Sequence, residues 1–163
     1  GDFSTVMIGK GINNQIKVLE SQDFPVSIGL FYTAFTQYLG FPYYGDEYKV
    51  MGLSPYGSPI FEKELEKIIW IGKENILEWD ESYFNLEGGV ISYEKNQPTA
   101  SPLFNKDKFE NLLGKERSRS ASIDKRHQDI ASSLQRHTEK LIFGIVERAF
   151  KLTKCKNVSI AGG

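Results

Sequence analysis

The residues Glu47–Gly57 read Glu-Tyr-Lys-Val-Met-Gly-Leu-Ser-Pro-Tyr-Gly, and the rest of the chain is interpreted around them. The stretch mixes a carboxylate, an ammonium group, two tyrosines and two glycines with apolar residues. An ordinary core segment looks different, because Lys and Glu are rarely buried unless they are paired. An aromatic segment precedes this stretch, and an apolar segment runs into Gly162-Gly163 at the end of the chain. We therefore predict that these three pieces form one wall of a nucleotide-binding cleft.

The spacing of Glu47 and Lys49 makes their role depend on the backbone. In an extended or turning loop, side chains two residues apart project to the same side, whereas on a helix they diverge by about 200°. In a loop, Glu47 would accept hydrogen bonds from ribose hydroxyls while Lys49 lies near a phosphate. The alternative is a salt bridge that only fixes the loop. The residue types alone leave both interpretations open.

The composition is that of a soluble globular protein. The 163 residues are 40% hydrophobic and 25% charged, which predicts one domain over residues 1–163. The net charge of −1 gives no electrostatic reason to expect a nucleic acid or a membrane surface as partner. No apolar run approaches the roughly 20 residues of a membrane span.

The single cysteine and the two ends of the chain suggest where the chain belongs. Cys155 is alone, which excludes an internal disulfide and favours a reducing, cytoplasmic location. Gly1 is not an initiator Met, and Gly162-Gly163 follow a predicted strand directly. We therefore expect a fragment of a longer protein. A truncated fold should expose apolar surface, and a homodimer is one way to cover it.

The first forty residues predict a hairpin and an aromatic helix. Alternation over Phe3–Lys10, a turn at residues 11–14 and a second extended segment at Gln15–Glu20 indicate a β-hairpin. Ser27 is placed to cap a helix that runs to about Leu39. Its apolar side chains are spaced to share one face, namely Phe31, Ala34, Phe35 and Tyr38. Tyr32 and Tyr38 are also candidates to present hydroxyls to a cleft.

The remainder of the chain predicts short elements and one long helix. We expect an amphipathic helix from Ser58-Pro59 to about Ile69, short strands over Ile76–Ile91 around Gly88-Gly89, and a helical patch near Asp107–Leu113. A long helix is predicted over Asp124–Thr153, with Ser122 or Asp124 as its cap and a strand over Asn157–Ala161 after it. Its apolar side chains form one stripe, namely Ile130, Leu134, Leu141, Ile145 and Leu152. The order of elements places the chain in the α/β class, with an α+β arrangement within the fragment.

The histidines do not predict a metal site. His127 and His137 are ten residues apart on the same predicted helix. This separation is about 15 Å along the helix axis, too far for a shared ion, so both are predicted to lie at the surface or at an interface. Gln135 and Glu139 lie one helical turn apart, and solvent exposure is the default interpretation of that pair.

Four segments, in order, carry a specific resemblance. Phe24–Phe41, which reads Phe-Pro-Val-Ser-Ile-Gly-Leu-Phe-Tyr-Thr-Ala-Phe-Thr-Gln-Tyr-Leu-Gly-Phe, strongly resembles the nodulation-protein-type carbamoyltransferase family. Glu47–Gly57 resembles the second signature of the family, and Asp129–Gln135 and Ile160–Gly163 resemble later ones. The four segments are distributed across nearly the whole chain.

The resemblance implies a fold and an activity. The fold would be part of an actin-like, sugar-kinase-like ATPase domain of the ribonuclease H-like type, and the chain would be an interior fragment of the N-terminal carbamoyltransferase domain. Family members are O-carbamoyltransferases, which use carbamoyl phosphate and ATP to make carbamoyl-adenylate. They then transfer the carbamoyl group to a hydroxyl of a sugar, an antibiotic or a nodulation factor.

The resemblance also implies a set of nucleotide-binding residues, namely Glu47, Lys49, Gly52, Gly162 and Gly163. The family uses a divalent metal whose ligands lie outside this chain, so the fragment is expected to be inactive alone. No catalytic residue within the chain is identified. Two departures from the family pattern are Val26, at a position that is often polar, and Ser54, where Ala is common.

Two other functions stay open. A carbohydrate-kinase-like phosphotransferase would use the same fold, and dependence on carbamoyl phosphate rather than transfer of the γ-phosphate separates the two enzymes. A non-catalytic interaction module is the third hypothesis. The concentration of polar residues and glycines in Glu47–Gly57 disfavours that hypothesis, because a scaffold does not need them.

Overall fold

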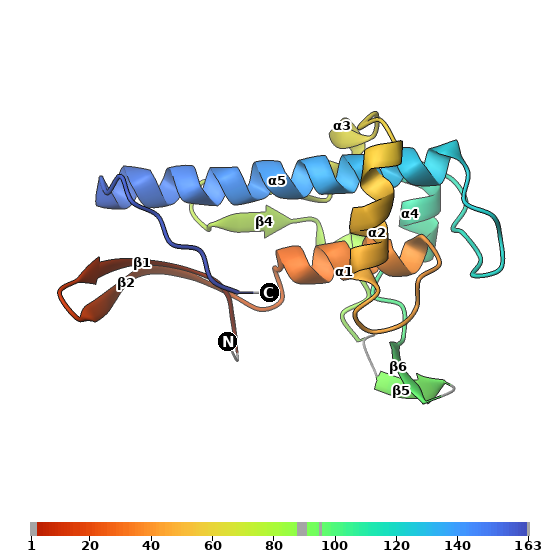
Figure 1. Ribbon diagram of the computed structural model, residues 1–163, viewed down its shortest axis with the longest axis horizontal. Helices are drawn as coiled ribbons and strands as arrows, with labels where there is room; N and C mark the ends of the chain where they lie inside the picture. The colour runs from red at the N-terminus through yellow and green to blue at the C-terminus, as the bar shows by residue number, and fades with distance from the viewer. Residues whose placement is uncertain (1–2, 88–90, 95, 163) are drawn as a thin grey trace.

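The computed structural model describes residues 3–87, 91–94 and 96–162. Figure 1 shows a long helix along one side of the molecule, with shorter helices across one end and a hairpin beside the other. In chain order the elements are β1 Ser4–Ile12, β2 Gln15–Asp23, α1 Ile28–Tyr38, α2 Glu47–Leu53, the 3-10 turn η1 Ser54–Tyr56, α3 Glu62–Leu65, β3 Ile69–Ile71, β4 Leu77–Trp79, the 3-10 turn η2 Glu81–Tyr83, β5 Ile91–Glu94, β6 Gln97–Ala100, α4 Lys106–Leu113 and α5 Lys125–Thr153.

The described residues confirm the mixed α/β class. Their strands form three antiparallel sheets of two strands each, β1–β2, β3–β4 and β5–β6. The wider actin-like ATPase architecture stays a prediction. No helix in the described ranges is both long and apolar enough to cross a membrane.

Helix α1 confirms the predicted aromatic helix. The Ser27 hydroxyl accepts a hydrogen bond from the Leu30 backbone N–H, which caps the first turn. All four side chains of the predicted face are fully buried. Phe35 packs on Phe109 of α4 with ring centroids 4.9 Å apart, and Tyr38 packs on the same ring at 5.4 Å. This aromatic cluster joins α1 to α4 and forms the centre of the core.

Helix α5 confirms the predicted long helix and its cap. The Asp124 carboxylate accepts from the His127 backbone N–H, while His127 Nδ1 accepts from the Asp124 backbone N–H, so both orphan donors are satisfied. The predicted apolar stripe is buried from Ile130 to Leu141 but not at the end of the helix. Ile130 and Leu134 are fully buried, whereas Leu152 is exposed.

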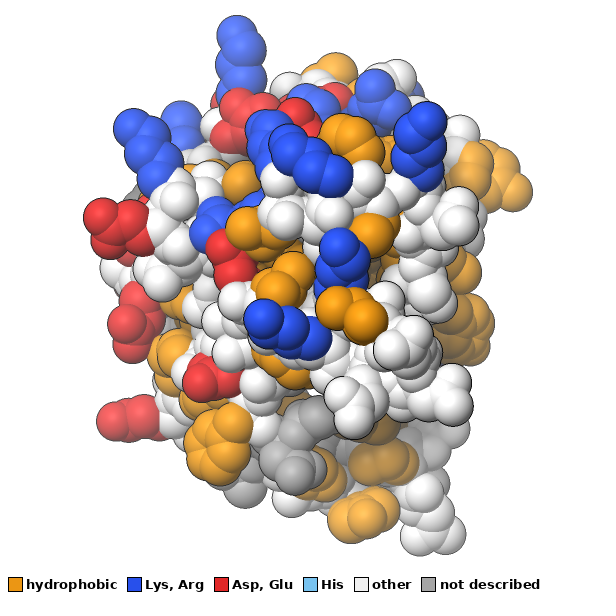
Figure 2. All heavy atoms as spheres, turned by 90° about the vertical axis from the view of Figure 1, so that its left-hand side faces the viewer, with side chains coloured by type: hydrophobic (Ala, Val, Ile, Leu, Met, Phe, Trp, Pro, Cys, Tyr) orange, Lys and Arg blue, Asp and Glu red, His pale blue; other side chains and the backbone are white. Residues whose placement is uncertain are grey.

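The β1–β2 hairpin is confirmed, and it lies beside the second half of α5. Arg148 of α5 joins the two, because its Nε lies 2.6 Å from Glu20 Oε2 of β2. Its guanidinium also donates to backbone carbonyls of the β3–β4 connection. Figure 2 shows that this end of the molecule presents hydrophobic side chains between lysines and arginines. Met7, Ile16 and Val18 are exposed there.

Three predicted elements are corrected. Residues 157–162 form no strand and are exposed. A strand needs a neighbour for its backbone hydrogen bonds, and no strand in the described ranges pairs with this segment. The helix predicted from Ser58 to Ile69 is limited to α3. The strand β6 was not predicted. Glu47–Tyr56 is helical, as α2 and η1, rather than a loop.

Candidate functional site

A hollow of about 360 Å³ lies where η1 and the following loop meet the first half of α5. α2 lies across α5 in the same region (Figure 1). Eight residues line the hollow, and most are polar or charged: Ser54, Pro55, Pro59, Glu62, Ser132, Gln135, Arg136 and Glu139. The hollow therefore offers several hydrogen-bonding and charged groups to a ligand.

The loop at one wall of the hollow is held to α5 through its backbone. The Ser58 N–H donates to Asp129 Oδ1 at 2.6 Å, and the Phe61 N–H donates to Ser133 Oγ at 3.0 Å. These bonds use backbone donors that a helix from Ser58 would leave unpaired at its first turn. Side chains of α5 therefore satisfy the backbone donors of this loop, and α3 begins directly after it, at Glu62.

Gly57 allows this close approach. A Cβ at Gly57 would lie 2.0 Å from the carbonyl oxygen of Gln128 on α5. Since real Cβ atoms do not come this close to an oxygen, only glycine fits where the chain passes over α5. The second glycine of the Glu47–Gly57 stretch, Gly52, has open space around its Cβ position.

A chain of hydrogen bonds connects α1 to the floor of the hollow. The Tyr32 hydroxyl donates to Gln135 Oε1 at 3.1 Å, and Gln135 Nε2 donates to Glu139 Oε1 at 3.1 Å. The Glu139 carboxylate only accepts, so it fixes which way the Gln135 amide faces. Burial, and then the charge of Glu47, raise the pKa of Tyr32 to about 12, so the hydroxyl stays a donor.

Of the two cationic side chains described at the mouth of the hollow, one is in an ion pair and the other is not. Lys140 pairs with Glu62 and lies 3.7 Å from Glu66. Arg136 is exposed and makes no hydrogen bond or ion pair within the described ranges. The hollow therefore offers carboxylate acceptors, which suit hydroxyl donors, and an unpaired guanidinium, which suits an anion.

Glu47 and Lys49 do not converge on one point. They lie on α2, where residues two apart diverge by about 200°, so the prediction of a loop is wrong at this position. The Glu47 carboxylate accepts from the Thr33 hydroxyl of α1 at 2.6 Å. The segment folds as a helix because Val50 is fully buried on its inner face, which apolar spacing alone did not reveal.

Lys49 is held by an ion pair, with Asp46 rather than with Glu47. Its Nζ lies 2.6 Å from Asp46 Oδ1, and this hydrogen bond raises the pKa of the Lys49 ammonium. The ring centroids of Phe41, Tyr43 and Tyr48 lie 5.8–5.9 Å from the same nitrogen. The side chain is thus fixed by its own neighbourhood.

The predicted glycines have different positions. Gly52 is exposed on α2, and Gly162 has a positive φ of 132° at the end of the described chain. Gly163 lies outside the described residues. No hydrogen bond joins residues 157–162 to α2 within the described ranges. Nucleotide contact by Glu47, Lys49 and these glycines stays a prediction.

Both histidines are buried, which corrects the prediction that they lie at the surface or at an interface. His127 is 5% exposed and His137 3% exposed. His137 Nε2 bonds the Ile69 carbonyl of β3 at 2.9 Å, and its Nδ1 has no hydrogen-bond partner. Burial lowers the pKa of both imidazoles. In the part of the chain that the structure describes, no three His, Cys, Asp or Glu side chains are grouped to hold a metal ion.

The sequence predicted only some of the residues at the hollow. Tyr32 was a candidate to present its hydroxyl to a cleft, and it reaches Gln135 of the hollow. Tyr38, the other candidate, instead donates to the Gly114 carbonyl. Gln135 and Glu139 showed a signal, their spacing of one turn, but solvent exposure was the default interpretation. Arg136 carried no signal in the sequence.

Comparisons with known proteins agree along the whole chain. A family model for the carbamoyltransferase N-terminus matches residues 2–163. The chain is 32% identical to the uncharacterized protein sll1178 of Synechocystis over 165 residues. It is 29% identical to nodulation protein NolNO of Sinorhizobium fredii and 29% identical to nodulation protein NolO of Bradyrhizobium diazoefficiens.

All of this chain is covered in each comparison, but it spans only 25%, 21% and 26% of the three relatives, respectively. The resemblance read from the four ordered segments is thereby confirmed. The match over residues 2–163 shows that the chain belongs to the carbamoyltransferase N-terminal family.

Proposed function

We propose that this chain supplies a nucleotide-binding surface of an ATP-dependent O-carbamoyltransferase. The full-length protein would transfer a carbamoyl group from carbamoyl phosphate, through carbamoyl-adenylate, to a hydroxyl of a sugar or natural product. Membership of the carbamoyltransferase N-terminal family supports the transfer. Because the chain spans about a quarter of its relatives, the activity belongs to the longer protein, with an actin-like ATPase domain as its proposed fold.

The observation that supports a nucleotide is the chemistry of the hollow. Glu62 and Glu139 are acceptors that are each held by a neighbouring side chain, Lys140 and Gln135 respectively. Arg136 is a cation without a protein partner in the described ranges. Ribose hydroxyls donate and phosphates carry negative charge, so the donor and acceptor set of the hollow fits ATP.

In this proposal the side chains of the hollow bind ATP and orient it. Glu139 and Glu62 accept hydrogen bonds from the ribose hydroxyls of ATP, while Arg136 binds a phosphate oxygen. The bonds from Tyr32 to Gln135 and from Gln135 to Glu139 fix the carboxylate before the ligand arrives, which reduces the entropy lost on binding. Glu47, Lys49, Gly52, Gly162 and Gly163 remain proposed contacts from the family resemblance.

The divalent metal of the family does not fit the described residues. The buried imidazoles of His127 and His137 bond backbone groups, and no metal-binding group of side chains surrounds them in the described ranges. We derive no step through a metal from this chain.

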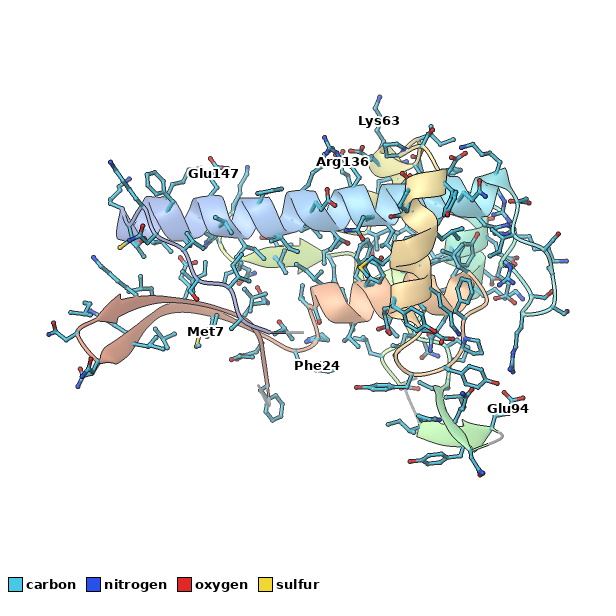
Figure 3. The ribbon with its side chains drawn as sticks, in the orientation of Figure 1. Met7, Phe24, Lys63, Glu94, Arg136 and Glu147 are labelled. Atoms are coloured by element: carbon cyan, nitrogen blue, oxygen red, sulfur yellow. The ribbon has the colours of Figure 1, made fainter. Side chains whose placement is uncertain are left out.

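Calorimetric titration of the full-length protein with ATP, with and without Mg²⁺, tests the proposal. Arg136→Ala should weaken ATP binding roughly ten- to a hundredfold, because a charge-assisted hydrogen bond contributes about 1.5–3 kcal/mol. Binding of adenosine, which has no phosphate, should not change. Lys63→Ala is the matched control, since Lys63 and Arg136 project from the same side of the molecule (Figure 3) and Lys63 does not line the hollow.

If Arg136→Ala and Glu139→Gln both bind ATP as tightly as the unmodified protein, the hollow is not the nucleotide site. If the folded full-length protein does not bind ATP, the proposal of a nucleotide-binding surface is wrong. Transfer of the γ-phosphate to a sugar without carbamoyl phosphate would instead establish the phosphotransferase alternative.

A further inference from the structure

Helix α3 carries Glu62 of the hollow, but it is too short to fix its own position. It spans only Glu62–Leu65, and Phe61 at its N-cap provides no side-chain cap. A single helical turn is not stable alone, because fixing its backbone costs more free energy than its few hydrogen bonds return. Figure 1 shows that α3 lies against α5. The position of the Glu62 carboxylate is therefore set by the contacts that hold α3 to the rest of the protein.

An apolar contact and a polar contact hold the two ends of this turn. At the C-terminal end, Leu65 is fully buried in the core. At the N-terminal end, the Phe61 N–H donates to Ser133 Oγ of α5 at 3.0 Å. This donor directly precedes Glu62, whereas the bond from the Ser58 N–H to α5 lies further back along the chain. Ser133 thus anchors the backbone next to the hollow.

Ser133 is well placed to act as this anchor. It is fully buried in α5, on a stretch where Ile130 and Leu134 are also fully buried. Serine is not favoured in a helix interior for its own sake, because its hydroxyl competes with the backbone for hydrogen bonds. Here the hydroxyl donates to the Asp129 carbonyl at 2.7 Å, which leaves its lone pairs free to accept from Phe61. Both capacities of the hydroxyl are therefore used.

We propose that Ser133 is a positioning residue for the ribose of the bound nucleotide, an inference that rests on the proposed function of the hollow. It acts through the Phe61 backbone on Glu62, which accepts from a ribose hydroxyl. Ser133 itself is not among the described residues that line the hollow, so it does not touch the ligand. Arg136, which binds phosphate in the same proposal, lies on α5 and does not depend on α3. The ribose and the phosphates are thus held by separately supported side chains.

Calorimetric titration of full-length Ser133→Ala with three ligands tests this separation. Affinity for adenosine should fall roughly two- to tenfold, the effect of losing one ordinary hydrogen bond. The preference for adenosine over 2′,3′-dideoxyadenosine, which lacks both ribose hydroxyls, should shrink with it. Affinity for inorganic tripolyphosphate should not change. A merely structural role of Ser133 would weaken all three ligands alike.

Two further variants make the result specific to the path through Glu62. Thr138→Val removes another buried hydroxyl from α5, one that makes no hydrogen bond within the described ranges, and it should leave the adenosine preference unchanged. In a Glu62→Gln background, Ser133→Ala should no longer alter that preference, because its effect passes through the carboxylate. If Ser133→Ala does not fold at the assay temperature, Ser133→Cys replaces it, since the thiol is only a weak acceptor.

An unchanged adenosine preference in the Ser133 variant, or an equal loss of adenosine and tripolyphosphate, would overturn the positioning role and leave the proposed function standing. A loss that persists in full in the Glu62→Gln background would overturn it as well. If the wild-type full-length protein binds neither adenosine nor ATP, the proposed function fails and the positioning role fails with it.

Discussion

At the scale of single residues, the two glycines of the stretch Glu47–Gly57 have opposite structural requirements. Gly57 passes over α5 with no room for a Cβ, whereas Gly52 lies in a helix with open space around it. Both were read from one segment of sequence, where nothing distinguishes them. The difference arises from α5, more than seventy residues further along the chain.

Gly57→Ala should destabilise the protein by about 1–3 kcal/mol, because the added methyl group must displace the backbone of α5. Gly52→Ala should stabilise it by about 0.5–1 kcal/mol, since alanine replaces glycine within a helix. Urea unfolding of both variants checks the pair. A neutral Gly57→Ala would show that η1 does not need its close contact with α5.

Lys49→Ala should lower the thermal stability of the ligand-free protein. Asp46 is buried, and without Lys49 its carboxylate keeps only the Tyr43 N–H at 3.2 Å among its hydrogen bonds. A buried acceptor that loses a partner costs about 1–3 kcal/mol, which a thermal melt resolves.

A parallel ATP titration of the same variant separates the two proposed roles of Lys49. Weaker ATP binding would add a nucleotide contact to its structural role. An unchanged melting temperature would contradict the structural role.

At the scale of elements, α5 combines a well-packed first half with a sparsely covered second half. The first half carries both histidines, the residues that bind the η1 loop, and the four α5 residues that line the hollow. Sequence periodicity predicted this helix and its cap, because both depend on neighbours along the chain. It did not predict the burial of the histidines, which depends on β3 and on the packing above the helix.

The buried histidines should make stability depend on pH below neutrality. Their pKa values are lowered from 6.5 in the folded state, so below pH 6.5 the unfolded chain binds more protons than the native one. The free energy of unfolding should therefore be greatest above the ordinary imidazole pKa of 6.5 and should fall as the pH is lowered toward 5. Urea unfolding across this range measures the slope.

His137→Asn should reduce that slope, because it removes one of the titrating groups. Among the charged side chains near His137, Lys140 has a raised pKa, mainly through its hydrogen bond to Glu62, and so stays charged in this window. The lowered pKa values of Asp80, Asp124 and Asp129 act only below about pH 4, so they do not interfere. Constant stability between pH 7 and pH 5 would contradict the burial of the imidazoles.

At the scale of the whole molecule, apolar side chains are exposed at the end formed by the hairpin and the second half of α5. Met7, Ile16 and Phe143 are among them, and Figure 2 shows hydrophobic groups at that end. Large exposed apolar patches mark interaction surfaces. We therefore expect this 163-residue chain to associate with itself, as the sequence predicted for a homodimer.

Sedimentation velocity over a range of concentrations checks this expectation. The dimer fraction should rise with concentration, and the double variant Met7→Lys, Phe143→Glu should shift the chain toward monomer by placing charges on the surface. Tyr93→Ser is the control, because it removes an exposed apolar group from a different face. A monomer at all concentrations would contradict the homodimer.

The sequence by itself determined the elements whose signals are local. Apolar spacing, Ser27 and Asp124 at their caps, and the turn at residues 11–14 predicted α1, α5 and the hairpin, because those interactions lie within a few residues. Four ordered segments also identified the family. Only the tertiary structure decided the rest. Glu47–Gly57 became a helix, residues 157–161 remained without a strand partner, and Tyr32 reached Gln135, because each outcome depends on groups distant in sequence whose contacts local patterns do not encode.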